Sequence, residues 1–133
     1  MLSLNDLKHR IITVFERIPI EDGYNHPGQR LIQKAISKMG DEALLLLFFM
    51  LFDPGTNPSL AAGIIRCLGR LPIPDEEWCV LITSEGLKST HIEVRDAIMQ
   101  AVESWDNKRI FDELKKHNEP NSWLKDYSKR ILN

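Results

Sequence analysis

The sequence predicts an all-α fold, an α-solenoid of about four helical hairpins (about eight helices) in a single domain over residues 1–133. A helix-sized apolar pattern recurs along the chain, no segment alternates apolar and polar residues as a strand does, and the connections are short. The pattern occurs as Leu60, Gly63, Ile64, Cys67, Leu68 and Leu71, as Val94, Ala97, Ile98, Ala101, Val102 and Trp105, and as Leu124, Tyr127, Ser128, Ile131 and Leu132.

The spacing of these copies is typical of helical repeats. The first two start 34 positions apart (60 to 94) and the last two 30 apart (94 to 124). The offsets i, i+3, i+4, i+7 and i+8 place the apolar residues on one stripe of a helix. Because such a stripe must be buried against a neighbour, we expect the repeated helices to stack. Helices are expected over residues 4–18, 27–39, 42–52, 59–70, 74–87, 91–104, 107–116 and from 120 to near the C-terminus.

The first two helices have clear boundaries. Ser3 or Asn5 can cap the first helix, and Pro19 ends it. A polar turn over residues 21–25 leads to the second helix, which Gly40 terminates.

The third helix is expected to follow Asp41 as its cap, and its residues 43–52 are apolar on every side. This run is about half the length of roughly 20 residues that a transmembrane helix requires. We therefore interpret it as the central buried helix of the domain, in preference to a membrane or partner surface.

The later helices follow turn and start signals. The turn over residues 53–58 leads to the fourth helix at Ser59. Pro74 at the first helical position, followed by three acidic residues, predicts the start of the fifth, because acids complement the positive end of the helix dipole. Apolar stripes define the sixth and seventh helices, and Pro120 is expected to begin the eighth.

Composition favours a globular protein that does not bind nucleic acid. Hydrophobic residues make up 43% and charged residues 27% of the chain. A net charge of -2 and a pI near 6.1 provide no broad basic field for a polyanion. The first residues lack the pattern of a secretion signal, so we expect a cytoplasmic location without membrane association.

We expect no metal and no cofactor. Cys67 and Cys79 fall at apolar positions on separate helices and are interpreted as reduced core thiols rather than a disulfide. The histidines at positions 9, 26, 91 and 117 are not spaced as metal ligands, either with each other or with the cysteines.

The sixth helix, residues 91–102, resembles the inner helix of a HEAT or HEAT-like repeat, with the Val-Arg-x-Ala signature at residues 94–97. The resemblance extends over about residues 26–133. It implies a right-handed stack of helix pairs whose second helices line a concave binding surface. Ala61 and Lys125 stand at the position of the signature arginine in the flanking copies, so irregular packing between units is expected.

A polar stripe on the sixth helix, Glu93, Asp96, Gln100 and Glu103, is the candidate binding surface. Its i, i+3, i+7, i+10 spacing puts the four residues on one face, which the repeat geometry would turn to the concave side. Flanking positions on the fourth and eighth helices are Arg66, Trp123, Asp126 and Arg130. An acidic ridge with arginines beside it suits a basic protein partner, although a solvated helix face has the same pattern.

Trp123 is the candidate aromatic anchor, because it precedes the core residue Leu124 and is expected at the open end of the stack or exposed. Trp78 and Trp105 are interpreted as packing residues. Catalysis is not expected: Glu93 and Asp96 have no apolar pocket around them, and the sequence lacks a nucleophile motif, a glycine-rich phosphate loop or a histidine-centred triad.

These patterns predict a non-catalytic protein-binding module with unspecified oligomeric state. Its size, mild acidity and lack of catalytic motifs resemble immunity proteins, which neutralise a cognate bacterial toxin, for example a basic nuclease in contact-dependent inhibition. A HEAT-like adaptor, chaperone or maturation factor similar to the phycobilisome lyases is an alternative. A HEAT-like alkylpurine glycosylase is another, but it would need a basic groove, against which the acidic ridge argues.

Overall fold

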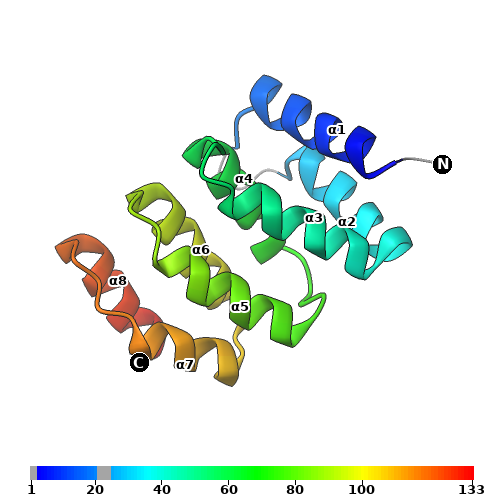
Figure 1. Cartoon of the computed structure of the whole chain (residues 1–133). Coiled ribbons are helices and arrows are strands. Elements are labelled where there is room, and N and C mark those ends of the chain that lie inside the picture. Colours follow the sequence, from blue (N-terminus) through cyan, green and yellow to red (C-terminus); the bar gives the residue numbers. More distant parts are fainter. Residues whose placement is uncertain (1–2, 21–24) are drawn as a thin grey trace.

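The computed structural model describes residues 3–20 and 25–133, and within these ranges it contains eight α-helices and no strand. The all-α prediction is confirmed, while residues 21–24 of the turn predicted over residues 21–25 lie outside the described residues. The helices are α1 (Leu4–Arg17), α2 (Pro27–Met39), α3 (Asp41–Phe52), α4 (Pro58–Gly69), α5 (Glu76–Leu87), α6 (Ile92–Trp105), α7 (Lys108–Lys116) and α8 (Ser122–Leu132) (Figure 1).

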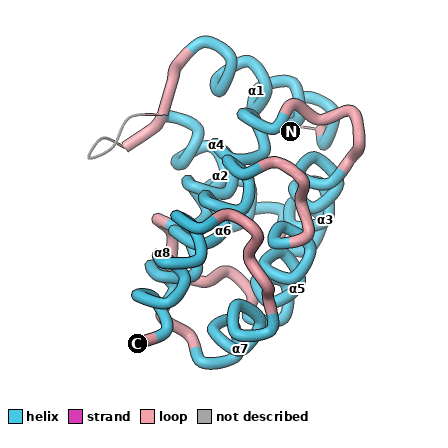
Figure 2. Tube along the Cα trace, turned by 90° about the vertical axis from the view of Figure 1, so that its left-hand side faces the viewer, coloured by secondary structure: helices cyan, strands magenta, loops and turns pink. Residues whose placement is uncertain are grey.

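Helices α2 to α8 form two layers (Figure 2). Helices α3, α5 and α7 contact one another in series in one layer, and α2, α4, α6 and α8 do so in the other. Each helix also contacts its hairpin partner, which gives the pairs α1–α2, α3–α4, α5–α6 and α7–α8. Helix α1 contacts α4 as well as α2 and α3, so the first hairpin packs across both layers.

Two contacts join residues that are one predicted repeat spacing apart. The Ser59 hydroxyl donates to Glu93 Oε2 over 3.2 Å, and the Trp78 indole N–H donates to the Leu44 carbonyl over 3.0 Å. Both pairs are 34 residues apart, which is the spacing predicted between the first two copies. The sequence period therefore corresponds to the step between neighbouring hairpins.

Helices α4 and α6 approach closely at the centre of the molecule. A Cβ atom on Gly69 would lie 2.7 Å from the Ala101 Cα, so only a glycine allows this separation. The Trp105 indole N–H donates to the Leu68 carbonyl over 3.1 Å and joins the two helices again. The core also includes Cys67 and Cys79, which are buried free cysteines, as predicted.

Two helices start later than predicted, because an Asx side chain caps each of them. Asp75 and Asn121 each accept a hydrogen bond from a backbone N–H of the following first turn. Pro74 and Pro120, which were expected at or near the first helical position, therefore lie before the helices.

The apolar helix α3 differs most from its prediction. Gly40, with φ +56°, ends α2 and also caps α3, so that Asp41 is the first helical residue and not the cap. Leu45 and Phe49 are 57% and 61% exposed. The prediction of an enclosed helix is wrong for this face, because α1, α2, α4 and α5 cover only the other sides of α3.

Across the described ranges, none of the helices combines the length and apolar character needed to cross a bilayer.

Candidate protein-binding surface

The polar stripe lies on α6 between α4 and α8, both of which contact α6. Glu103 is exposed, whereas Glu93, Asp96 and Gln100 are half-buried. The stripe is therefore less exposed than a free helix face would be, because α4 and α8 pack against α6 on its two sides.

Each carboxylate of the stripe contacts a residue of a neighbouring helix. Glu93 accepts the hydrogen bond from Ser59 on α4, and the Asp96 carboxylate lies 3.9 Å from the Arg66 guanidinium, also on α4. Glu103 accepts a hydrogen bond of 3.3 Å from the Tyr127 hydroxyl on α8. Three helices thus fix the positions of three negative charges.

Two buried polar atoms where α4 meets the stripe lack a hydrogen-bond partner within the described residues, namely Arg66 Nε and Asp96 Oδ1. An unsatisfied buried polar atom costs about 1 to 3 kcal/mol.

An aromatic pair extends the surface onto α8. Trp123 is 57% exposed, and its ring centroid lies 6.3 Å from that of Tyr127. The Arg130 guanidinium carbon lies 5.7 Å from the Tyr127 ring centroid, within reach of a cation–π contact. Burial and the neighbouring Glu103 carboxylate raise the pKa of Tyr127 to about 12, so its hydroxyl stays protonated and able to donate at neutral pH.

The structure brings most of the predicted residues into one connected surface, which we call the α4–α6–α8 face. Arg66 pairs with Asp96, while Tyr127 connects Glu103 to Trp123 and Arg130. Gln100 on α6 and the exposed Asp126 on α8 take no part in these contacts. The sequence predicts Tyr127 at a core position, and the residue does pack against the core while its hydroxyl reaches Glu103. A tyrosine in place of the small residue of the other copies was the available signal of this added contact.

A cavity of about 440 Å³ lies at the α1 end of this face. Arg66 and Glu93 line it together with apolar residues of α1, α4 and the segment after α1, including Phe15, Ile20 and Leu60. The face therefore combines charged groups with a recess that can accept an apolar side chain.

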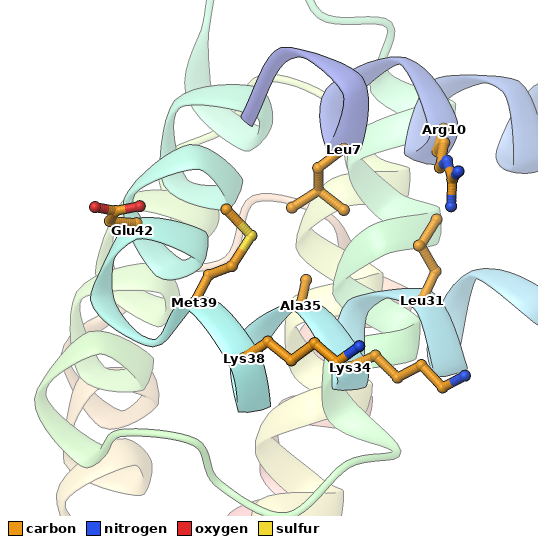
Figure 3. Close-up of a pocket in the computed structure, with 8 residues that line it drawn as sticks. All are labelled: Leu7, Arg10, Leu31, Lys34, Ala35, Lys38, Met39 and Glu42. Carbon is orange, nitrogen blue, oxygen red and sulfur yellow. The ribbon is translucent and has the colours of Figure 1, made fainter. Parts of the chain in front are cut away.

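A second cavity, of about 790 Å³, lies between α1 and α2 and is separate from this face (Figure 3). Leu7, Leu31, Ala35 and Met39 form its apolar walls, and Arg10, Lys34, Lys38 and Glu42 surround them. None of the eight predicted site residues lines it.

The remaining indole groups have packing roles, as predicted. The N–H groups of Trp78 and Trp105 donate to main-chain carbonyls of neighbouring hairpins, and Trp105 is only 7% exposed. Of the three tryptophans, Trp123 is the exposed one.

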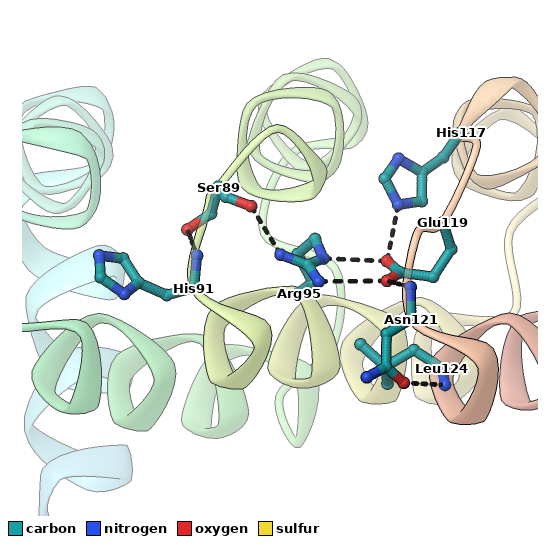
Figure 4. A network of polar contacts seen from close by, with 7 residues as sticks. All are labelled: Ser89, His91, Arg95, His117, Glu119, Asn121 and Leu124. Atoms are coloured by element: carbon teal, nitrogen blue, oxygen red, sulfur yellow. Dashed lines mark hydrogen bonds and ion pairs between the residues drawn. The ribbon is translucent and has the colours of Figure 1, made fainter.

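A buried ion pair next to the face holds α6 to the loop between α7 and α8 (Figure 4). Arg95 donates from Nε and Nη2 to the two carboxylate oxygens of Glu119, over 2.9 and 3.1 Å, and from Nη1 to the Ser89 carbonyl over 2.9 Å. The Glu119 carboxylate also contacts the His117 ring nitrogen and accepts from the Asn121 backbone N–H, each over 2.9 Å.

This network sets the protonation of Glu119. Burial alone would raise the pKa of its carboxyl, but the hydrogen bonds from Arg95, His117 and the Asn121 N–H outweigh burial and lower it. Sequence reasoning identified Arg95 through the repeat signature but not Glu119, because the two are 24 residues apart and meet only in the folded chain. The role of the pair is structural, since both side chains are buried.

No group of three or more histidine, cysteine, aspartate or glutamate residues is placed to hold a metal ion in the part of the chain that the structure describes. The α4–α6–α8 face itself carries hydrogen-bonding groups, charged groups and aromatic rings.

Comparison of the chain with known protein families, with curated proteins and with solved structures finds no match. The resemblance to HEAT-like repeats rests on the residues of α6 and on the spacing of the copies.

Proposed function

We propose that the chain is a non-catalytic protein-binding module whose α4–α6–α8 face docks a basic surface of a partner protein. The fixed polar stripe carries this proposal: Glu93, Asp96 and Glu103 are held in place by residues of the two flanking helices, with Trp123 exposed beside them. Charges positioned before binding reduce the ordering that association requires, and complementary charge accelerates encounter.

The charge balance of the face supports a basic partner. Its named residues include four carboxylates, on Glu93, Asp96, Glu103 and Asp126, against the two guanidinium groups of Arg66 and Arg130. A polyanion such as nucleic acid would be repelled by the excess of negative charge. A protein surface rich in lysine or arginine, with an apolar side chain for the recess, matches both features.

Within this class we propose an immunity protein that neutralises a toxin with a basic domain. The support is the small all-α fold, the net charge of -2 and the resemblance stated above. A toxin bound on the α4–α6–α8 face would be held by charge at the stripe and by Trp123 at the edge.

Capture from the native cells tests the proposal, with mass spectrometry of what co-purifies and an absorbance measurement for nucleic acid. The tagged wild type should retain one protein in stoichiometric amount, and that protein should be toxic alone and harmless when this chain is present. The double variant Glu93→Lys/Glu103→Lys should lose it. Co-purified nucleic acid in place of a protein would contradict the proposal.

A matched control separates the stripe from net charge. Glu85→Lys/Asp112→Lys makes the same charge change on α5 and α7, in exposed ion pairs that contribute little to stability. This variant should retain the partner. Equal loss in both double variants would show that total charge, and not the face, is recognised.

Kinetics with the isolated partner then test the roles of charge and of Trp123. The stripe variant should slow association and weaken its dependence on salt. Trp123→Ala should leave association unchanged and accelerate dissociation by about tenfold or more, as expected for an anchor worth at least about 1.4 kcal/mol. An unchanged dissociation rate would show that Trp123 is not part of the interface.

A further inference from the structure

The opposite layer of the molecule carries an apolar groove between α3 and α5, which lie side by side (Figure 1). We call it the α3–α5 groove; its volume is about 700 Å³. Leu45, Phe49 and Leu81 line it and are 57%, 61% and 46% exposed. Large apolar side chains grouped in this way mark an interaction surface, because soluble monomers rarely leave a contiguous patch of them in water.

The walls of the groove are held rigidly. The Trp78 indole N–H donates to the Leu44 carbonyl and ties α5 to α3. Phe48 meets Phe49 edge to face, with ring centroids 6.2 Å apart, and meets Phe52 in a similar way at 4.9 Å. A ligand therefore meets an ordered apolar surface that requires little rearrangement.

The charges that line the groove are all negative. Asp41, Asp75, Glu77 and Glu113 line it, and its lining contains no lysine or arginine. Arg109 pairs with Glu77, and Lys116 pairs with Glu113 over 3.2 Å. The two aspartates come from the starts of α3 and α5. An apolar centre within an acidic rim selects a ligand with apolar and cationic groups together.

We propose that the α3–α5 groove binds an amphipathic helix of a partner protein, with lysine or arginine residues flanking its apolar face. Two adjacent helices offer a channel into which a third can pack, as each helix of the layer packs on its neighbours. Anchors at i, i+3 or i+4 and i+7 would contact Leu45, Phe49 and Leu81, and the flanking cations would meet the acidic rim. The described residues form no sheet, so strand addition is not available here.

Charge argues against two other occupants. A second copy placed groove to groove would bring two acidic rims together, which costs free energy. An anionic membrane surface would be repelled by the same rim. The groove lies in the layer opposite the α4–α6–α8 face (Figure 2), so this proposal does not rest on the proposed function.

Selection of peptides from a displayed random library on the full chain tests the proposal without assuming a sequence. The enriched peptides should carry apolar residues at helical spacing with lysine or arginine between them. One such peptide, made synthetically, should shift backbone amide resonances of α3 and α5, and replacing its cations with glutamate should abolish binding. Enrichment of peptides without this pattern, or shifts on other helices, would overturn the proposal.

Variants of the chain sharpen the test. Phe49→Lys and Leu81→Lys, made separately, should each weaken binding of that peptide by about tenfold or more. Leu4→Lys, at a 38% exposed leucine of α1, is the matched control and should bind as the wild type does. Glu93→Lys/Glu103→Lys should also bind normally, which separates this groove from the α4–α6–α8 face.

Circular dichroism must show that each variant is folded, and the two groove variants serve as independent checks. Binding that survives both substitutions would refute the proposal. If the wild type forms a dimer and Phe49→Lys dissociates it, the occupant of the groove is a second copy of the chain and not a partner helix. If the wild type binds anionic vesicles and Phe49→Lys abolishes that binding, the occupant is a membrane.

Discussion

Substitution of Glu119 by glutamine should strongly destabilise the fold. The change keeps the shape of the side chain but removes its charge, so that the guanidinium of Arg95, which is only 7% exposed, loses its counter-ion. In the wild type, the Glu119 carboxylate accepts hydrogen bonds from Arg95 through both of its oxygens and another from the Asn121 N–H. A glutamine has one acceptor oxygen for these donors and turns its own amide donors toward a cation.

The magnitude follows from burial. Breaking a buried ion pair by removing one partner typically lowers the free energy of unfolding by about 3 to 5 kcal/mol. The total free energy of unfolding of a domain of this size is about 5 to 15 kcal/mol. We therefore expect Glu119→Gln to lower the melting temperature by roughly 10 °C or more. Chemical denaturation with circular dichroism measures the free energy directly.

A matched control isolates the effect of burial. Glu85→Gln removes the charge from an exposed pair with Lys88 and should change the free energy of unfolding by less than about 1 kcal/mol. A double-mutant cycle with Arg95→Met should show coupling between Arg95 and Glu119. Equal effects of Glu119→Gln and Glu85→Gln, or additive losses in the cycle, would refute the reasoning.

The ion pair between Arg95 and Glu119 also makes the stability of the fold depend on pH. Folding lowers the pKa of Glu119 from its ordinary value of 4.5. The ionised carboxylate therefore contributes its full stabilisation at pH values above 4.5, and this stabilisation is lost as the pH falls through the lowered pKa of the folded state. The wild type should therefore lose more stability below pH 4.5 than Glu119→Gln does. Parallel curves for the two proteins would contradict this assignment.

Three further predictions concern the core. Ala97→Asp should unfold or loosen the domain, because it places an unpaired charge at a fully buried position, and a normal thermal melt would contradict the packing of α6. Gly69→Ala should lower the free energy of unfolding by about 1 to 3 kcal/mol, because the new Cβ would meet the Ala101 backbone, and an unchanged denaturation midpoint would show that the helices can separate freely. Burial raises the pKa of Cys67 to about 11 and that of Cys79 to about 12, so alkylation by iodoacetamide at neutral pH should require unfolding, as mass spectrometry of native and denatured samples can show.

The sequence predicted the existence and order of the helices because periodicity and caps are local signals. The hydrogen bond between Ser59 and Glu93 joins residues that are 34 positions apart, which is the predicted repeat spacing. Boundaries at Pro74 and Pro120 were misplaced, since the Asx caps that follow them compete for the same helix starts.

Features that depend on tertiary placement could not be predicted in the same way. The run of residues 43–52 shows that a helix is apolar, but not which sides its neighbours cover, so the exposure of Leu45 and Phe49 was missed. The pairing of Arg95 with Glu119 and the contact of Tyr127 with Glu103 each join residues 24 positions apart, and neither pair has a sequence signature. The residues of the polar stripe were found from their spacing, whereas the contacts that fix them were not.

The order of contacts between hairpins bears on how the chain unfolds. Among the described helices, α7 and α8 contact only α5 and α6 outside their own hairpin, so the last hairpin can detach without breaking a contact to α1, α2, α3 or α4. Stacks held by nearest-neighbour contacts open from their ends, with each unit exchanging its amide hydrogens at its own rate. The link from Arg95 to Glu119 crosses the boundary between the last hairpin and the rest, so it determines whether that hairpin exchanges together with the core or ahead of it.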